Sequence, residues 1–585
     1  MNYSRTGLSL VIAIIAACSS DAPLEQDQDE TGTRPVVHEQ TEIVRAITEE
    51  GRERDSAKHE PAGPPIITES YDMMIGPQHP GVSMMLAEAP LRAATEPLYR
   101  EQYQHPGDHA VLRVGDHPVS TFSIDVDTGA YANARRWLNQ GRLPPEDAVR
   151  VEEFINYFDY DYRVPEDRSQ PFLVETEVAP APWNRNTHLF RIGIQGYQVP
   201  KRELPAANLV FLVDVSGSMG SADKLPLLKQ SLAMLAQQLG ARDCLSIVVY
   251  AGASGMALPP TPGNQTARIL AALDQLEAGG STNGGAGIRL AYQLARQQFI
   301  PNGVNRVILA TDGDFNVGMA STTELIDLIQ RQREAGIALT TLGFGSGNYN
   351  DHLLEQLADE GNGNHAYIDR LSEARKVLFD QLSATLMTIA SDVKIQVEFN
   401  PQTVAEYRLI GYENRALNEE DFNNDRIDAG EIGAGHRVTA IYEISLTESG
   451  YRRLPERRYG EQPQRERLAG PQGRGQELAH LRIRYKQPGQ DQSRLIEAPV
   501  LKRSVVPDVA GASEDFRFAA AVAAFGQKLR GGDWLETFGY PEIAELARNA
   551  RGQDPYGYRG EFLQLVALAE MLDPAADLAQ EHERH

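Results

Sequence analysis

The sequence has 585 residues and a formal net charge of −25 at pH 7. This length exceeds what one hydrophobic core usually organises, so we expect about three or four structural units. The acidic excess argues against nucleic acid as a partner, because binding to phosphates requires clustered lysines and arginines. The basic run at 452–468 contains glutamates and lies among glycines and prolines, which is typical of a solvated loop.

Residues 1–17 have the pattern of an export signal. Arg5 precedes an apolar stretch at 7–17 that is too short to span a membrane as a mature helix. The sequence IAAC that ends at Cys18 resembles the lipobox of bacterial lipoproteins. That resemblance implies that Cys18 is diacylated and anchors an extracytoplasmic protein. A serine at position 19, rather than an aspartate, resembles the lipoproteins that diderm bacteria sort to the outer membrane. The alternative is an ordinary signal peptide followed by an incidental cysteine.

Residues 18–109 are polar and charge-rich, with scattered prolines and glycines and no hydrophobic period. Such a stretch cannot bury enough apolar surface to offset its chain entropy, so we expect a flexible, lipidated tether. Cys244 is the only other cysteine and lies in an apolar run. It has no partner in the mature chain, and we interpret it as a buried small hydrophobic residue.

The region 110–206 has two helical hydrophobic patterns followed by two strand-like segments. The apolar residues recur at helical spacing in 131–138 and 149–158. Apolar and β-branched residues then favour strands at 172–180 and 188–199. We interpret residues 110–206 as a separate N-terminal region that precedes the central domain.

Residues 207–390 alternate between apolar strands and amphipathic helices. Because the strands are nearly continuous in Val, Ile, Leu and Ala, both of their faces should be covered. This pattern predicts an α/β fold, a doubly wound and mainly parallel sheet with helices on both faces. The expected strands are 208–216, 244–250, 305–313, 337–345 and 365–369, and the expected helices are 224–240, 266–279, 287–299, 322–336, 350–361 and a last one reaching about 390.

The remaining chain changes character twice. Residues 391–510 contain short alternating segments that predict an antiparallel β-rich domain. Residues 511–585 form a helical tail, with apolar helices expected at 516–530 and 561–572. We expect these two helices to pack together or against a neighbouring domain.

Five polar residues occupy expected strand ends or the loops beside them. Asp214, Ser216 and Ser218 follow one apolar strand, Thr282 lies in a glycine-rich loop before a helix, and Asp312 ends another strand. Ligands of open parallel sheets bind where loops leave the carboxyl ends of the strands. Two carboxylates and three hydroxyls form an all-oxygen donor set, which suits Mg²⁺ better than Ca²⁺.

The order of these residues resembles the metal-ion-dependent adhesion site of von Willebrand factor type A domains, over about 207–390. The resemblance implies that the serines and the threonine contact the ion and that the aspartates bind it directly or through water. It also implies an open position for an Asp or Glu carboxylate of a protein partner. Mg²⁺ is the expected ion, with Ca²⁺ and Mn²⁺ as alternatives. The flanking regions resemble those of bacterial lipoproteins that combine such a domain with an N-terminal extension and a C-terminal domain of unknown function.

Three other patterns have simpler interpretations. The triplet at 127–129 echoes an aspartic protease signature, but no second such triplet follows, so we interpret it as a helix cap. The segment 421–432 resembles a calcium-binding EF-hand loop, yet Arg426 replaces its glycine and Ile432 its bidentate glutamate. We therefore interpret this segment as an acidic turn, with calcium binding as the alternative. No histidine is placed by a recognisable pattern to activate the serines as nucleophiles.

The sequence therefore predicts a cell-envelope lipoprotein that binds a protein partner through a divalent ion and has no enzymatic activity. The alternative is an envelope scaffold or assembly factor in which the metal is structural and the C-terminal region binds. Either protein would sit at a membrane through its lipid anchor.

Overall fold

The computed structural model describes residues 101–104, 107–124, 126–281, 284–313, 315, 322–427, 429–458, 474–490 and 492–573. Cys18, Thr282 and nearly all of the expected tether lie outside these residues. The described residues belong to one unit, Arg92–His585. Within them, no helix is both long enough and apolar enough to cross a membrane.

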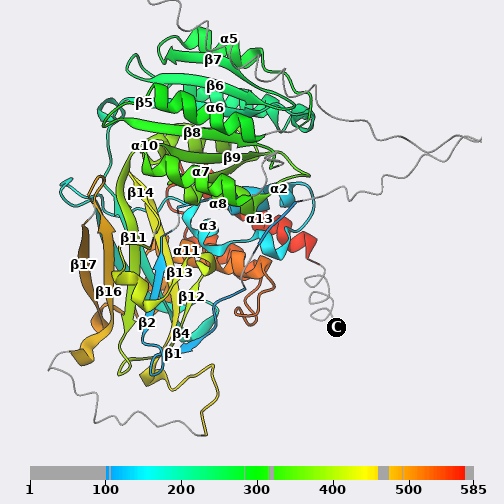
Figure 1. Ribbon diagram of the computed structural model, residues 1–585. Coiled ribbons are helices and arrows are strands. Elements are labelled where there is room, and N and C mark those ends of the chain that lie inside the picture. The colour runs from blue at the N-terminus through cyan, green and yellow to red at the C-terminus, as the bar shows by residue number, and fades with distance from the viewer. Residues whose placement is uncertain are drawn as a thin grey trace, which may run out of the picture. The chain divides into compact units, whose positions relative to one another are not determined.

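The predicted doubly wound sheet is present (Figure 1). Its six strands lie in the order β10-β9-β8-β5-β6-β7, and all neighbours are parallel except the last pair. The strands are β5 (Ala207–Asp214), β6 (Cys244–Tyr250), β7 (Ser254–Pro262), β8 (Val304–Thr311), β9 (Ala338–Phe344) and β10 (His365–Ile368). The sequence did not predict β7, whose prolines are tolerated because it is an edge strand. Cys244 starts β6 and is half-buried, not buried as expected.

Helices cover both faces of this sheet. Successive side chains of β5 point to opposite sides, so this strand contributes to a hydrophobic core on each face. Leu209, Phe211 and Val213 join one core cluster, and Val210 and Leu212 join another. The first cluster includes residues of α4 (Leu225–Ala236), α5 (Thr266–Asp274), α9 (Leu371–Arg375), the π-helix Lys376–Asp380 and α10 (Leu382–Leu386). The second includes residues of α6 (Gly284–Gln297), α7 (Thr322–Glu334) and α8 (Asp351–Glu360). The expected last helix is thus divided into three pieces and ends before 390.

Two antiparallel sheets combine strands from before and after the α/β segment (Figure 1). One sheet has the order β1-β12-β15-β4-β3, and the other has the order β13-β2-β11-β16-β17, with β14 paired to β11. The strands before the segment are β1 (Leu112–Arg113), β2 (Val119–Ser123), β3 (Phe172–Ala181) and β4 (Asn184–Gly196). The strands after it are β11 (Thr388–Phe399), β12 (Val404–Ile410), β13 (Ala416–Leu417), β14 (Ile432–Gly433), β15 (Arg437–Leu446), β16 (Glu477–Lys486) and β17 (Ser493–Leu501). One hydrophobic cluster contains residues of both sheets, so the two form one β unit.

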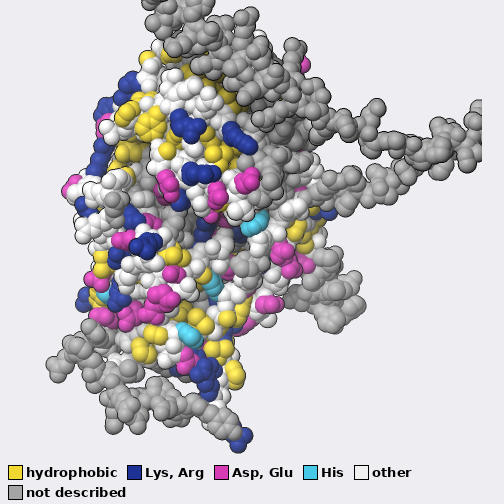
Figure 2. Space-filling view, in the orientation of Figure 1, with side chains coloured by type: hydrophobic (Ala, Val, Ile, Leu, Met, Phe, Trp, Pro, Cys, Tyr) yellow, Lys and Arg dark blue, Asp and Glu magenta, His cyan; other side chains and the backbone are white. Residues whose placement is uncertain are grey.

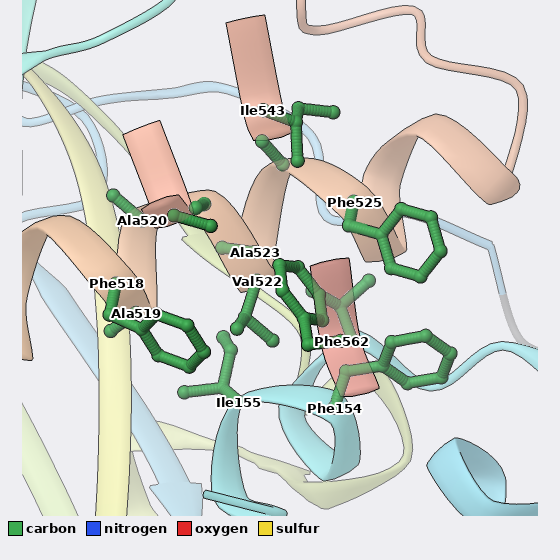
Figure 3. Packing of buried hydrophobic residues seen from close by; sticks show 14 of the residues in the cluster. Phe154, Ile155, Phe518, Ala519, Ala520, Val522, Ala523, Phe525, Ile543 and Phe562 are labelled. Atoms are coloured by element: carbon green, nitrogen blue, oxygen red, sulfur yellow. The ribbon is translucent and has the colours of Figure 1, made fainter. Parts of the chain in front are cut away.

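Helices from the two ends of the described chain also share a core. They are α2 (Gly129–Asn139), α3 (Val151–Asn156), α11 (Glu514–Leu529), α12 (Tyr540–Asn549) and α13 (Tyr558–Leu572). Phe154 and Ile155 of α3 lie beside Phe518 and Phe525 of α11 and Phe562 of α13 (Figure 3). The tail helices therefore pack together and against the helices of region 110–206.

Charged side chains of both signs lie interspersed on the face of the molecule shown in Figure 2. The charge of that described face is therefore mixed, although the whole chain is strongly acidic.

Candidate functional site

The carboxyl ends of β5 and β8 lie side by side, and each leads to an aspartate. Asp214 is the last residue of β5, and Asp312 directly follows β8. The register pairs Val213 with Ala310, so both carboxylates emerge at the same edge of the sheet. Their exposed fractions are 0% and 1%. The structure thus brings together the two aspartates that lie 98 positions apart in the chain.

The loop after β5 places the two serine hydroxyls beside each other. The backbone N–H of Ser216 donates to Oδ1 of Asp214 at 2.8 Å. The Oγ atoms of Ser216 and Ser218 lie 3.1 Å apart. A short 3₁₀ turn, Gly217–Gly220, follows, and it directs Ser218 back toward Ser216. Ser216 is buried and Ser218 is half-buried, so the pair lies at the edge of solvent.

Backbone hydrogen bonds tie this loop to the segment that precedes Thr282. The N–H of Gly217 donates to the carbonyl of Gly280 at 3.0 Å, and the N–H of Gly279 donates to the carbonyl of Val215 at 2.7 Å. Gly280 has φ of +84°, a conformation that favours glycine. Thr282 itself lies outside the described residues, but the chain leading to it is fixed beside the serine loop.

Two hydroxyl groups hold the other oxygen of Asp214. Thr311 Oγ1 donates to Oδ2 at 3.0 Å, and the Tyr250 hydroxyl donates to the same atom at 3.2 Å. The sequence motif did not include these two residues, although both end strands that neighbour β5. Their place at the ends of strands next to β5 was the signal that could have identified them. Burial raises the pKa of Asp214 to about 6; hydrogen bonds from Ser216 oppose this shift, and the charge of Asp312 adds to it.

A buried lysine contacts the second aspartate. The Nζ of Lys224 donates to Oδ2 of Asp312 at 2.9 Å, and the lysine is only 6% exposed. Its aliphatic stem packs against Gly345 at the end of β9, where a Cβ would overlap it. The sequence pattern placed Lys224 at the start of a helix and indicated no role for it in the site.

The described part of the site fits a hard divalent cation. All donors are oxygens, and two of them belong to buried carboxylates that lie close enough for the charge of Asp312 to raise the pKa of Asp214. Adjacent ligands of an octahedral Mg²⁺ ion lie about 3 Å apart, since its bonds to oxygen are about 2.1 Å. The separation of the Ser216 and Ser218 hydroxyls, 3.1 Å, matches that spacing. The residues that would hold the ion are Asp214, Ser216, Ser218, Thr282 and Asp312.

A cavity of about 500 Å³ borders this loop. Met219 and Gly220, directly after Ser218, form part of its wall. Its other walls come from α4, from α5 and from the segment that follows α5, and they are mainly apolar, including Leu225 and Leu270. The cavity could accept an apolar side chain close to the candidate ion position.

The aspartic protease-like triplet has a structural role that differs from the predicted one. Thr128 occupies the N-cap position of α2, but its side chain makes no capping hydrogen bond. Asp127 instead accepts a hydrogen bond from the backbone N–H of His365 in β10 at 2.9 Å. The Asp127 carboxylate therefore links the segment before α2 to the α/β sheet, because its hydrogen-bond partner lies in a distant strand and not in the helix that follows.

The acidic residues of the EF-hand-like segment also bond within the protein. Asp421 accepts from the backbone N–H of Asn418 at 3.0 Å and completes a capping box of the 3₁₀ helix Glu419–Asn423. Asp425 pairs with Arg484 at 3.2 Å. These contacts agree with the acidic-turn interpretation.

Three family models match the chain. "von Willebrand factor type A domain" covers 208–381, "von Willebrand factor" covers 97–191, and "Uncharacterized protein YfbK, C-terminal" covers 384–572. Among solved structures, von Willebrand factor type A from Catenulispora acidiphila is 14% identical, with a TM-score of 0.37, over 67% of this chain and 89% of that one.

The similarity to one curated protein extends over most of both chains. The protein YfbK of Escherichia coli (strain K12) is 48% identical over 486 residues, 82% of each chain. Inter-alpha-trypsin inhibitor heavy chain H3 of Homo sapiens is 26% identical over 264 residues, 41% of this chain and 29% of that protein. The chain therefore belongs to the YfbK family, with a von Willebrand factor type A domain between its two flanking regions.

Proposed function

We propose that this chain is a cell-envelope lipoprotein that binds a protein partner through a divalent ion, Mg²⁺ above all, at its type A domain. The domain itself supports a protein-interaction function. The observation that carries the proposal is the meeting of two buried carboxylates with two hydroxyls 3.1 Å apart at adjacent strand ends. Thr282 would complete the donor set.

The residues around the ligands are arranged to keep them in place. Thr311 and Tyr250 hold one oxygen of Asp214, and the N–H of Ser216 holds the other. A bound ion would supply a positive centre with a position open to an Asp or Glu carboxylate of the partner. Neutral hydroxyl ligands leave such an ion strongly electrophilic, because they neutralise none of its charge. The nearby cavity could accept an apolar side chain of the same partner.

The second candidate is an envelope scaffold in which the metal stabilises the fold and the C-terminal region binds. Buried ion pairs between the type A domain and its flanks favour it. Arg135 of α2 donates to Asp369 at 2.9 Å and to Glu373 at 2.7 Å, and is itself fully buried. Such contacts attach the type A domain to its N-terminal flank, which suits a protein whose regions act together as a scaffold.

A comparison of two serines in one loop tests the proposal. In the full chain, we expect Ser218→Ala to weaken Mn²⁺ binding at least about tenfold and to abolish Mg²⁺-dependent crosslinking to the partner in the native host, because a ligand is lost. Ser221→Ala is the control, since Ser221 is exposed and bonds to Asp223. Titration calorimetry measures the affinity, and mass spectrometry identifies the crosslinked partner.

Two results separate the candidates. Unchanged metal content and unchanged crosslinking after both EDTA and Ser218→Ala would contradict the proposal. Loss of the metal with crosslinking retained would favour the scaffold.

A further inference from the structure

The lysine beside the candidate metal ligands has a charge that the proposed function does not use. We infer that Lys224 is a built-in counter-cation: it neutralises Asp312 when no metal is bound, and it lowers the affinity of the site for a divalent ion. This inference rests on the proposed function, because it assumes that the ion binds at these aspartates.

The first argument is electrostatic. Asp214 and Asp312 are both buried at adjacent strand ends, and a buried charge is costly unless another charge compensates it. The Nζ of Lys224 lies 2.9 Å from Oδ2 of Asp312. Among the described residues, the Asp214 carboxylate accepts hydrogen bonds from neutral donors, namely Ser216, Thr311 and Tyr250.

The second argument concerns the position of the lysine. Lys224 is the N-cap residue of α4, where the helix dipole disfavours a positive charge. Its stem also requires a glycine at 345, because any Cβ there would overlap it, and the φ of Gly345 is +72°. The fold therefore accommodates a cation at an unfavourable place, and its contact with Asp312 offers the compensation.

The charges of these groups predict how the site responds to an ion. Asp214, Asp312 and Lys224 sum to −1, from two negative charges and one positive charge. A divalent ion brings this sum to +1, which an incoming carboxylate would neutralise. Without the lysine, the sums would be −2 and 0. Lys224 therefore stabilises the metal-free protein and repels the ion, so the fold does not depend on the metal.

The test compares two lysines of the same helix in the full chain. Lys224→Gln removes the counter-cation. Lys229→Gln is the matched control, because the Nζ of Lys229 donates to backbone carbonyls, those of Asp274 at 2.8 Å and Leu276 at 3.2 Å. Mn²⁺ affinity is measured by electron paramagnetic resonance, and the unfolding midpoint is measured in EDTA and in excess Mg²⁺.

We expect Lys224→Gln to bind Mn²⁺ about tenfold or more tightly, because a repulsive charge near the ion is gone. We also expect its midpoint to fall in EDTA and to recover in Mg²⁺, so that the gap between the two conditions widens. Lys229→Gln should leave that gap at its wild-type size. Lys224→Arg keeps the charge and should restore both wild-type properties.

Other outcomes would overturn the inference. An equal loss of midpoint in EDTA and in Mg²⁺, with Mn²⁺ affinity unchanged or weaker, would show that Lys224 is merely structural while the metal site stands. If the wild-type chain binds no Mn²⁺, the proposed function fails as well. If Lys224→Gln can be purified only with Mg²⁺ present, that dependence supports the inference, and Lys224→Arg should not share it.

Discussion

Asp214 shows how a single residue depends on partners from three strands. Its own strand, β5, positions it, whereas Tyr250 of β6 and Thr311 of β8 hold its Oδ2. A buried carboxylate keeps a fixed orientation only when such donors surround it. The geometry of the candidate site therefore depends on neutral residues as well as on the ligands.

The hydroxyl of Thr311 is the first test at this scale. Thr311→Val keeps the shape but removes the donor to Asp214 and the acceptor for the N–H of Gly313. We expect the free energy of unfolding to fall by about 2 kcal/mol. Urea denaturation in Mg²⁺ measures it, and exposed Thr323→Val should change it by less than about 0.5 kcal/mol. Equal losses in the two variants would contradict the role of Thr311.

Cys18 is the second residue with a distinct expectation. Cys18→Ser should abolish incorporation of labelled palmitate and release the chain from the outer-membrane fraction, because a serine cannot form the thioether of a lipoprotein anchor. Gradient fractionation of the native host measures the distribution. Ser20→Ala, close by in sequence, is the control and should remain membrane-bound. A Cys18→Ser chain that still fractionates with the outer membrane would contradict the lipid anchor.

At the scale of elements, helices from distant parts of the chain bury one another's apolar faces. The ring of Phe518 in α11 packs beside that of Phe562 in α13 (Figure 3), with the ring centroids 5.5 Å apart. The ring centroid of Phe518 also lies 5.0 Å from that of Phe158. None of the short N-terminal helices could bury its apolar face alone. The helical tail thus completes the core of the region that precedes the type A domain.

Truncation of one ring in this core tests that dependence. Phe518→Ala should lower the free energy of unfolding by about 3–5 kcal/mol, because it leaves a cavity among well-packed rings. Met571→Ala in α13 is the control, since Met571 is 81% exposed. Chemical denaturation followed by tryptophan fluorescence measures both. A small effect of Phe518→Ala would mean that the tail helices contribute little to the fold.

At the scale of the whole molecule, buried charged groups connect the type A domain to its flanks. Arg150 pairs with Asp351 of α8, and Arg135 pairs with Glu373 of α9. Burial opposes ionisation of Asp351 and Glu373, but these arginines outweigh it and hold both pKa values below their usual range. Burial, with help from Arg306 and Arg437, lowers the pKa of His436 to about 4.

These shifts predict that acid destabilises the protein. A group whose pKa is lowered by folding contributes stability above its unfolded pKa and loses it as the pH falls toward the folded pKa. For His436 the loss begins near its ordinary pKa of 6.5 and continues to about 4, at no more than about 1.4 kcal/mol per pH unit. Glu373 and Asp351 add to it below about 4.5.

Urea denaturation at a series of pH values between 7 and 4 measures this loss. His436→Gln should flatten the slope between pH 6.5 and 4.5 and leave the steeper loss below 4.5. A slope that His436→Gln does not change would assign the acid sensitivity to other groups.

Local patterns predicted much of the fold and part of the site. The alternation of apolar strands and helices predicted the α/β sheet, and D-x-S-x-S after β5 located the loop with Ser216 and Ser218. The same patterns missed β7, because its prolines are acceptable only at an edge that the sequence does not reveal. They also missed Lys224 and Thr311, whose roles depend on residues about 90 positions away.

The strand and helix periods, the charge balance and the strand-end motif can all be read from the chain itself, because each depends on neighbours within a few residues. The partnership of β4 with β15, of α3 with α11, and of Lys224 with Asp312 depends on the folded arrangement. Those contacts join segments that lie far apart in sequence, and no local pattern encodes which distant segment will cover a given face or neutralise a given charge.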